Sequence, residues 1–75
     1  MRSYNLFRRK GGESLCCAVP ESHAVPRFVT GGRWTFEGRV EEAAGVPRGF
    51  DGKAAATGVR FNGFYLFQAV DRRFG

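Results

Sequence analysis

The sequence predicts a small α+β fold. Its elements follow one another along the chain as β-β-β-α-β, and they form a mixed or antiparallel four-stranded sheet with one helix packed on one face. Four short segments are rich in apolar and aromatic residues, and the segment 52–61 has helical periodicity. Glycine and proline separate these segments. The 75 residues fit one domain, 1–75, and are too few for a barrel enzyme or a doubly wound nucleotide fold.

The first two strands are predicted to form a hairpin. Residues 3–8 and 14–19 are apolar runs, and the turn between them contains Gly11 and Gly12. Pro20 ends the second strand. Alternation places Leu15, Cys17 and Val19 on one face of that strand and Ser14, Cys16 and Ala18 on the other.

The third strand is predicted over residues 33–40. A loop over residues 20–30 precedes it, and Val25, Phe28 and Val29 of this loop are expected to fold back onto the core. Strict alternation then gives the third strand one apolar and one wet face. The apolar face would carry Trp34, Phe36 and Val40, and the wet face would carry Arg33, Thr35, Glu37 and Arg39.

The helix is predicted over residues 52–61, after one helical turn at 41–44. Asp51 is a suitable N-cap and Gly63 a suitable left-handed C-cap. The last strand follows at 64–70, and residues 71–75 form a basic tail that we expect to be frayed.

The expected strand order is 4-1-2-3. A meander of the first three strands, followed by a right-handed crossover, would return the last strand parallel to the third and beside the first. The sheet would then be mixed, with its single helix covering one face.

The last strand is apolar on both faces, although one helix covers only one face of the sheet. On the sheet face that the polar residues of the third strand mark as wet, the last strand would place either Tyr65, Phe67 and Ala69 or Phe64, Leu66 and Gln68. Such a patch is either covered, by the 20–30 loop or by a second copy of the chain, or used for binding. The predicted binding residues are Phe7, Arg33, Arg39, Tyr65 and Phe67, with Arg8, Arg9 and Lys10 as a phosphate-contacting cluster.

The sequence predicts no enzyme, no cofactor, no metal and no small-molecule substrate. His23, Cys16, Cys17 and Glu21 lack the spacing of a zinc site, and there is no glycine-rich phosphate loop. Adjacent cysteines cannot link distant parts of the chain, so both are expected to be reduced thiols. No apolar run is long enough to span a membrane, and the start of the chain lacks a signal-peptide core, so we expect a cytoplasmic protein.

Two function classes remain. Twelve basic and seven acidic residues give a net charge of +5, which favours acidic partners but also serves solubility. The favoured interpretation is a non-catalytic module for protein interaction or self-association through the aromatic sheet face. The alternative is a nucleic-acid-binding module that uses the same face with the surrounding arginines. Because no specific nucleic-acid motif is present, a protein partner or homodimer is favoured.

Overall fold

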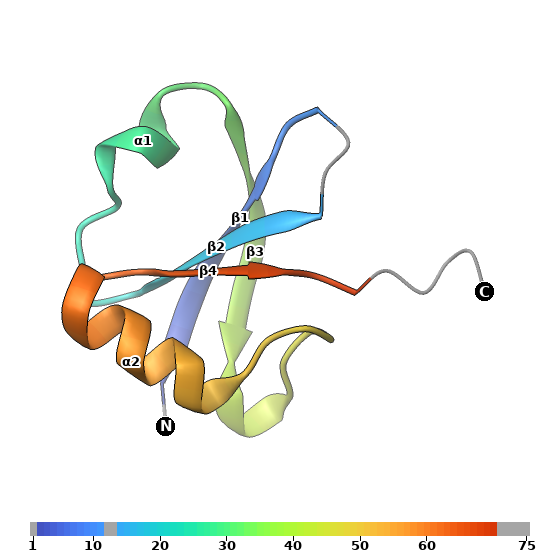
Figure 1. The fold of residues 1–75 in the computed structure, drawn as a ribbon, viewed down its shortest axis with the longest axis vertical. Helices are drawn as coiled ribbons and strands as arrows, with labels where there is room; N and C mark the ends of the chain where they lie inside the picture. The colour runs from blue at the N-terminus through green and yellow to red at the C-terminus, as the bar shows by residue number, and fades with distance from the viewer. Residues whose placement is uncertain (1, 12–13, 71–75) are drawn as a thin grey trace.

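The computed structural model, which describes residues 2–11 and 14–70, contains a four-stranded antiparallel sheet with one main helix (Figure 1). The α+β prediction is therefore confirmed. The predicted tail, residues 71–75, and Gly12 of the predicted turn lie outside the described residues. The elements are β1 (Ser3–Arg9), β2 (Leu15–Pro20), α1 (Arg27–Thr30), β3 (Trp34–Glu41), the 3-10 turn η1 (Glu42–Ala44), α2 (Gly52–Asn62) and β4 (Tyr65–Gln68).

The predicted strand order is wrong. The sheet has the order β3-β1-β2-β4, and every neighbouring pair is antiparallel. The hairpin of β1 and β2 is present, but β3 pairs with β1 instead of β2, and β4 pairs with β2 instead of β1.

Each of the two long connections crosses one face of this sheet. Residues 21–33 lead from β2 across to the far side of β1 and include α1, whereas residues 42–64 lead back from β3 to β4 and include α2. Figure 1 shows α1 and α2 separated by the strands, with β4 running between them. This order allows each connection to bury apolar side chains of a different face, which a simple meander would not do.

The face under α2, here called the α2 face, holds the larger core. Asp51 caps the helix, since its side chain accepts hydrogen bonds from the amides of Lys53 and Ala54, and Gly63 ends it at φ 86°, as predicted. The helix packs Ala55 and Val59 on the sheet. The other buried residues of this core are Tyr4, Leu6, Cys16, Ala18, Phe50 and Phe67.

The opposite face, here called the α1 face, is covered in part by α1 and the chain before it. Val29 of α1 is buried against Cys17 and Val19 of β2. Partly buried side chains surround this cluster: Phe7, Val25, Trp34 and Phe64. The prediction that Val25 and Val29 fold back onto the core is confirmed, whereas Phe28 stays 44% exposed.

The predicted alternation along β3 is wrong because the strand contains a β-bulge. Phe7 pairs with Phe36 and Leu6 with Gly38, so Glu37 is an extra residue on β3. Gly38 has φ 141°, a conformation that glycine adopts without strain. As a result, Trp34 and Phe36 share the α1 face with Arg39, while Val40 packs into the core of the α2 face.

Candidate interaction surface

A row of apolar side chains crosses the α1 face from edge to edge. The register aligns Phe36 of β3 with Phe7 of β1, Phe7 with Cys17 of β2, and Cys17 with Leu66 of β4. Residues aligned across strands present their side chains on the same face of a sheet. In the middle of this row Cys17 is buried and Phe7 partly buried, but both ends are exposed, Phe36 by 58% and Leu66 by 44%.

Four aromatic residues form what we call the aromatic patch: Phe7, Phe28, Trp34 and Phe36. Phe7 and Phe36 pack edge to face with ring centroids 5.6 Å apart, and Phe28 packs on Trp34 at 5.8 Å. Trp34 and Phe36 stand two residues apart on the same face of β3, before the bulge. The patch therefore consists of two aromatic pairs on one face, with Phe7, Trp34 and Phe36 held in place by sheet pairing and Phe28 supplied by α1.

Basic residues border the aromatic patch at one end of the sheet. The amide of Lys10 donates to the carbonyl oxygen of Arg33 at 2.8 Å, and Arg9 is aligned with Trp34. We call these three cations, Arg9, Lys10 and Arg33, the basic end. Among the described residues none of the three makes an ion pair with a carboxylate. Arg9 shares the α1 face with Trp34, whereas alternation places the exposed Lys10 and Arg33 on the other side of the same sheet end.

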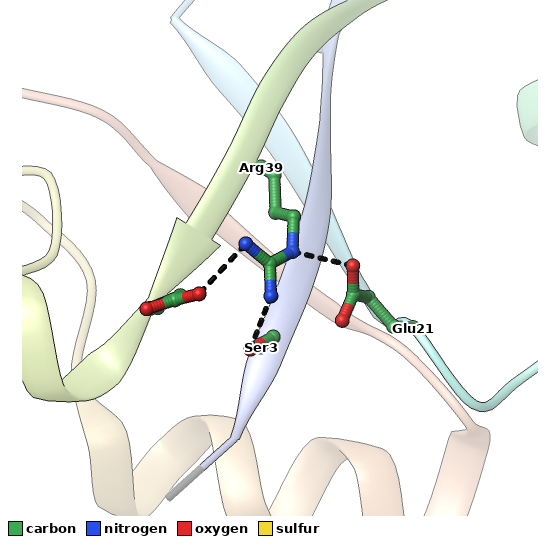
Figure 2. Close-up of polar contacts among 4 residues, drawn as sticks. Ser3, Glu21 and Arg39 are labelled. Atoms are coloured by element: carbon green, nitrogen blue, oxygen red, sulfur yellow. Dashed lines mark hydrogen bonds and ion pairs between the residues drawn. The ribbon is translucent and has the colours of Figure 1, made fainter.

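Arg39, at the other end of β3, is held in a closed ionic cluster. Its guanidinium binds Glu21 through Nε, Glu41 at 2.7 Å through Nη1 and the hydroxyl of Ser3 at 3.4 Å (Figure 2). The hydrogen bond to Glu21, and to a smaller extent the one to Glu41, raises the pKa of Arg39 above its ordinary value. With two carboxylates already bound to it, Arg39 is not positioned to receive a phosphate.

The structure brings only some of the predicted binding residues together. Phe7 and Arg9 lie on the α1 face, and Lys10 and Arg33 lie at the same end of the sheet, one residue further along, where alternation places them on the side of Arg8 and Thr35. Tyr65 and Phe67 lie on the opposite face, where they stack on each other and contact Phe50 within the core. The predicted grouping of Tyr65 and Phe67 with Phe7 and Arg39 on one face is therefore wrong. Arg8 also departs from the cluster, since it pairs with Glu37 at 3.4 Å.

Sequence reasoning missed Phe28, Trp34 and Phe36 as surface residues. Unbroken alternation assigned Trp34 and Phe36 to the core because it took no account of the bulge. A glycine inside an otherwise regular strand is a known sign of a bulge, and Gly38 could have given that warning. No local signal predicts that Phe28 remains exposed, because its exposure depends on how α1 sits on the sheet.

The two edges of the sheet differ in how open they are. Along β4 the amide of Val70 donates to the carbonyl oxygen of Arg48, and Gly49 lies so close to the backbone of Gln68 that a Cβ there would collide with it. The loop before α2 therefore lies against the end of β4. Among the described residues no strand pairs with the outer side of β3, so its edge is open.

The hydrogen-bond ladder determines which backbone groups of β3 point outward. Because Lys10 and Arg33 form a hydrogen-bonded pair, the alternation of an antiparallel ladder makes Arg8 and Thr35 the next such pair. The amide and carbonyl groups of Trp34 and Phe36 then point away from β1. The open backbone groups thus belong to the same residues whose rings form the aromatic patch.

A second surface feature is an open pocket of about 430 Å³ beside the Arg39 cluster. It is lined by Arg2, Ser3, Pro20, Glu21, Ser22 and His23. Ser22 and His23 lie within hydrogen-bonding distance at 3.3 Å, but both are exposed, and the carboxylate of Glu21 is bound by Arg39 instead of orienting His23. The described residues contain no group of three or more side chains suited to hold a metal ion.

The two thiols are buried on opposite faces of β2. Cys16 lies in the core of the α2 face and Cys17 in that of the α1 face, as the alternation predicts. Burial raises the pKa of Cys16 above its ordinary value and raises that of Cys17 to about 12. Both sulfurs therefore stay protonated and shielded near neutral pH, which is unfavourable for nucleophilic chemistry.

None of the helices among the described residues is long and apolar enough to cross a membrane. Comparison with protein-family models, with curated proteins and with solved structures found no match.

Proposed function

We propose that the protein is a non-catalytic binding module whose protein partner docks on the α1 face. The observation that supports this best is the exposure of Phe36, 58%, on a sheet position fixed beside Phe7 and Trp34. Phe28 and Leu66, each 44% exposed, extend the apolar surface on the same side. Large exposed apolar side chains that adjoin on one face are typical of interaction surfaces, and aromatic residues are enriched there.

The chemistry of the remaining surface supports a binding role over catalysis. The buried thiols, the exposed Ser22 and His23 and the occupied Glu21 supply no activated nucleophile with an oriented base. Two adjacent unlinked cysteines also fit a reducing compartment, so we place this function in the cytoplasm.

Nucleic-acid binding is the second candidate, and the basic end beside the aromatic patch favours it. Two observations count against it: Arg39 is paired with two carboxylates, and both Tyr65 and Phe67 pack in the core of the α2 face. The surface open to bases and phosphates is thus smaller than the sequence predicted.

Partner capture from the cells that produce this protein tests the proposal. Tagged wild-type protein is compared with Phe36→Ser, and Phe61→Ser serves as the matched control because Phe61 is 74% exposed on α2. We expect recovery of at least one protein partner, or self-association in sedimentation, to fall about tenfold in Phe36→Ser and to persist in the control. Nuclease treatment separates direct partners from those bridged by nucleic acid. Partners that all survive Phe36→Ser, with a monomeric wild-type protein, contradict the proposal.

A further inference from the structure

The open edge of β3 is usable over only part of its length. Its second half is protected by the bulge at Glu37 and by the charged side chains of Arg39 and Glu41, both bound in the ionic cluster. Bulges and charges are the devices by which proteins prevent edge strands from pairing. Its first half, around Trp34 and Phe36, has neither device and presents outward amide and carbonyl groups. Only this half can accept an added strand.

The charges around the α1 face differ from one end to the other. The open half of β3 adjoins the basic end, whereas at the protected half Arg39 is paired with Glu21 and Glu41, and Glu42 accepts a hydrogen bond from the backbone amide of Arg2. A ligand on the open half therefore meets positive charge, whereas a polyanion that crosses the whole face would find Arg39 already occupied by two carboxylates at the far end.

We infer that the partner is an acidic, extended segment of another protein, which adds as a strand to the edge of β3 at Trp34 and Phe36. This inference rests on the proposed function and names the partner of the same face. Main-chain hydrogen bonds to the two outward residues would align the segment, and its apolar side chains would cover the aromatic patch. Side chains of an added strand alternate between the two faces, so its carboxylates would pair with Arg9 on the α1 side and with Arg33 and Lys10 on the other side.

Two other occupants fit less well. A nucleic acid has phosphates for the basic end but no alternating donors and acceptors to match the open backbone of Trp34 and Phe36. A second copy of this chain would bring a second set of Arg9, Lys10 and Arg33 close to the same short segment, and like charges disfavour this arrangement.

A display library of random peptides of about twelve residues, long enough to extend along an edge strand, supplies the probe. We expect the enriched peptides to carry an excess of Asp and Glu and to weaken in binding by about tenfold or more on Arg33→Glu and on Phe36→Ser. Lys53→Glu and Phe61→Ser, matched changes on the exposed side of α2, should alter the dissociation constant less than about twofold. Failure to enrich any peptide, or enrichment without an acidic excess, overturns the inference.

Methylation of single backbone nitrogens in an enriched peptide tests the strand geometry. Binding should be lost at every second position and kept at the positions between, because alternate amides of an added strand face β3. A uniform response along the peptide contradicts the addition of a strand. Full competition by an oligothymidine would favour a nucleic acid as the occupant, and a wild-type protein that sediments as a dimer would favour a second copy; either result overturns the inference. If binding still depends on Phe36 while acidity and alternation are absent, the proposed function stands and only this inference falls.

Discussion

At the scale of single residues, two tyrosines on the α2 face differ in how their hydroxyl groups are satisfied. The hydroxyl of Tyr65 accepts a hydrogen bond from the amide of Asp51 at 3.2 Å, next to the cap of α2. Tyr4 is fully buried, and its hydroxyl has no hydrogen-bond partner among the described residues. Burial also raises the pKa of Tyr4 above its ordinary value. A buried hydroxyl without a partner loses hydration and gains nothing in return.

Removing these two hydroxyls should therefore have opposite effects on stability. Tyr4→Phe is expected to raise the free energy of unfolding by up to about 1 kcal/mol, and Tyr65→Phe to lower it by about 1 kcal/mol, since only the second change breaks a hydrogen bond. Urea unfolding followed by circular dichroism measures both, with unchanged m-values as the control for two-state behaviour. Equal destabilisation by the two changes would show that Tyr4 has a partner after all.

At the scale of elements, β3 shows how one inserted residue changes a surface. The bulge between Phe36 and Gly38 moves Trp34 and Phe36 to the α1 face while Val40 stays in the opposite core. Without the bulge, alternation would place the rings of Trp34 and Phe36 on the same face as Val40, under α2. The bulge thus creates the aromatic patch and ends the part of the edge that another strand can use.

Hydrogen exchange can test which side of β3 is open. The amide of Glu42 donates to the carbonyl oxygen of Arg2. In the ladder after the bulge, the backbone amide and carbonyl groups of Val40 and Gly38 therefore point toward β1, and those of Arg39 and Glu41 point away from it. We expect the amides of Thr35, Gly38 and Val40 to exchange slowly and those of Trp34, Phe36, Arg39 and Glu41 to exchange quickly. Amide exchange followed by NMR gives the pattern, and protection of Trp34 and Phe36 in the free protein would mean that their edge is already covered.

At the scale of the whole molecule, two crossing connections cover the two faces unequally. Residues 42–64 provide an eleven-residue helix for one face, while residues 21–33 provide only the four residues of α1 for the other. The smaller cover leaves Phe28, Phe36 and Leu66 exposed. The candidate surface is thus a consequence of how little chain is available to cover the second face of the sheet.

The stability of the whole fold should fall at alkaline pH. Burial raises the pKa of the Cys17 thiol from 9.0 to about 12, so between these values the folded chain keeps a proton that the unfolded chain loses. The free energy of unfolding then decreases as pH rises, by up to about 1.4 kcal/mol per pH unit for this group. Urea unfolding at about pH 8 and about pH 10.5 should show a shallower decrease in Cys17→Ala than in the wild type. Identical decreases would assign the effect to other groups.

Local sequence signals predicted much of the secondary structure. Asp51 and Gly63 delimit α2, Gly11 follows the end of β1, Pro20 ends β2, and period-two alternation orients Cys16 and Cys17 correctly. These features depend on the conformational preferences of a few neighbouring residues, so they can be read without knowing the rest of the fold.

The α+β class, the helix with its caps, the first hairpin and the presence of more aromatic residues than one helix can cover could all be predicted from local patterns in the sequence. The strand order, the bulge in β3, the packing of Tyr65 and Phe67 in the core of the α2 face and the exposure of Phe28 and Phe36 emerged only from the three-dimensional arrangement. The physical reason is the range of the interactions involved. Caps and turns are satisfied within a few residues, whereas which strands pair, and which rings α1 and α2 cover, follows from contacts between segments far apart in the chain.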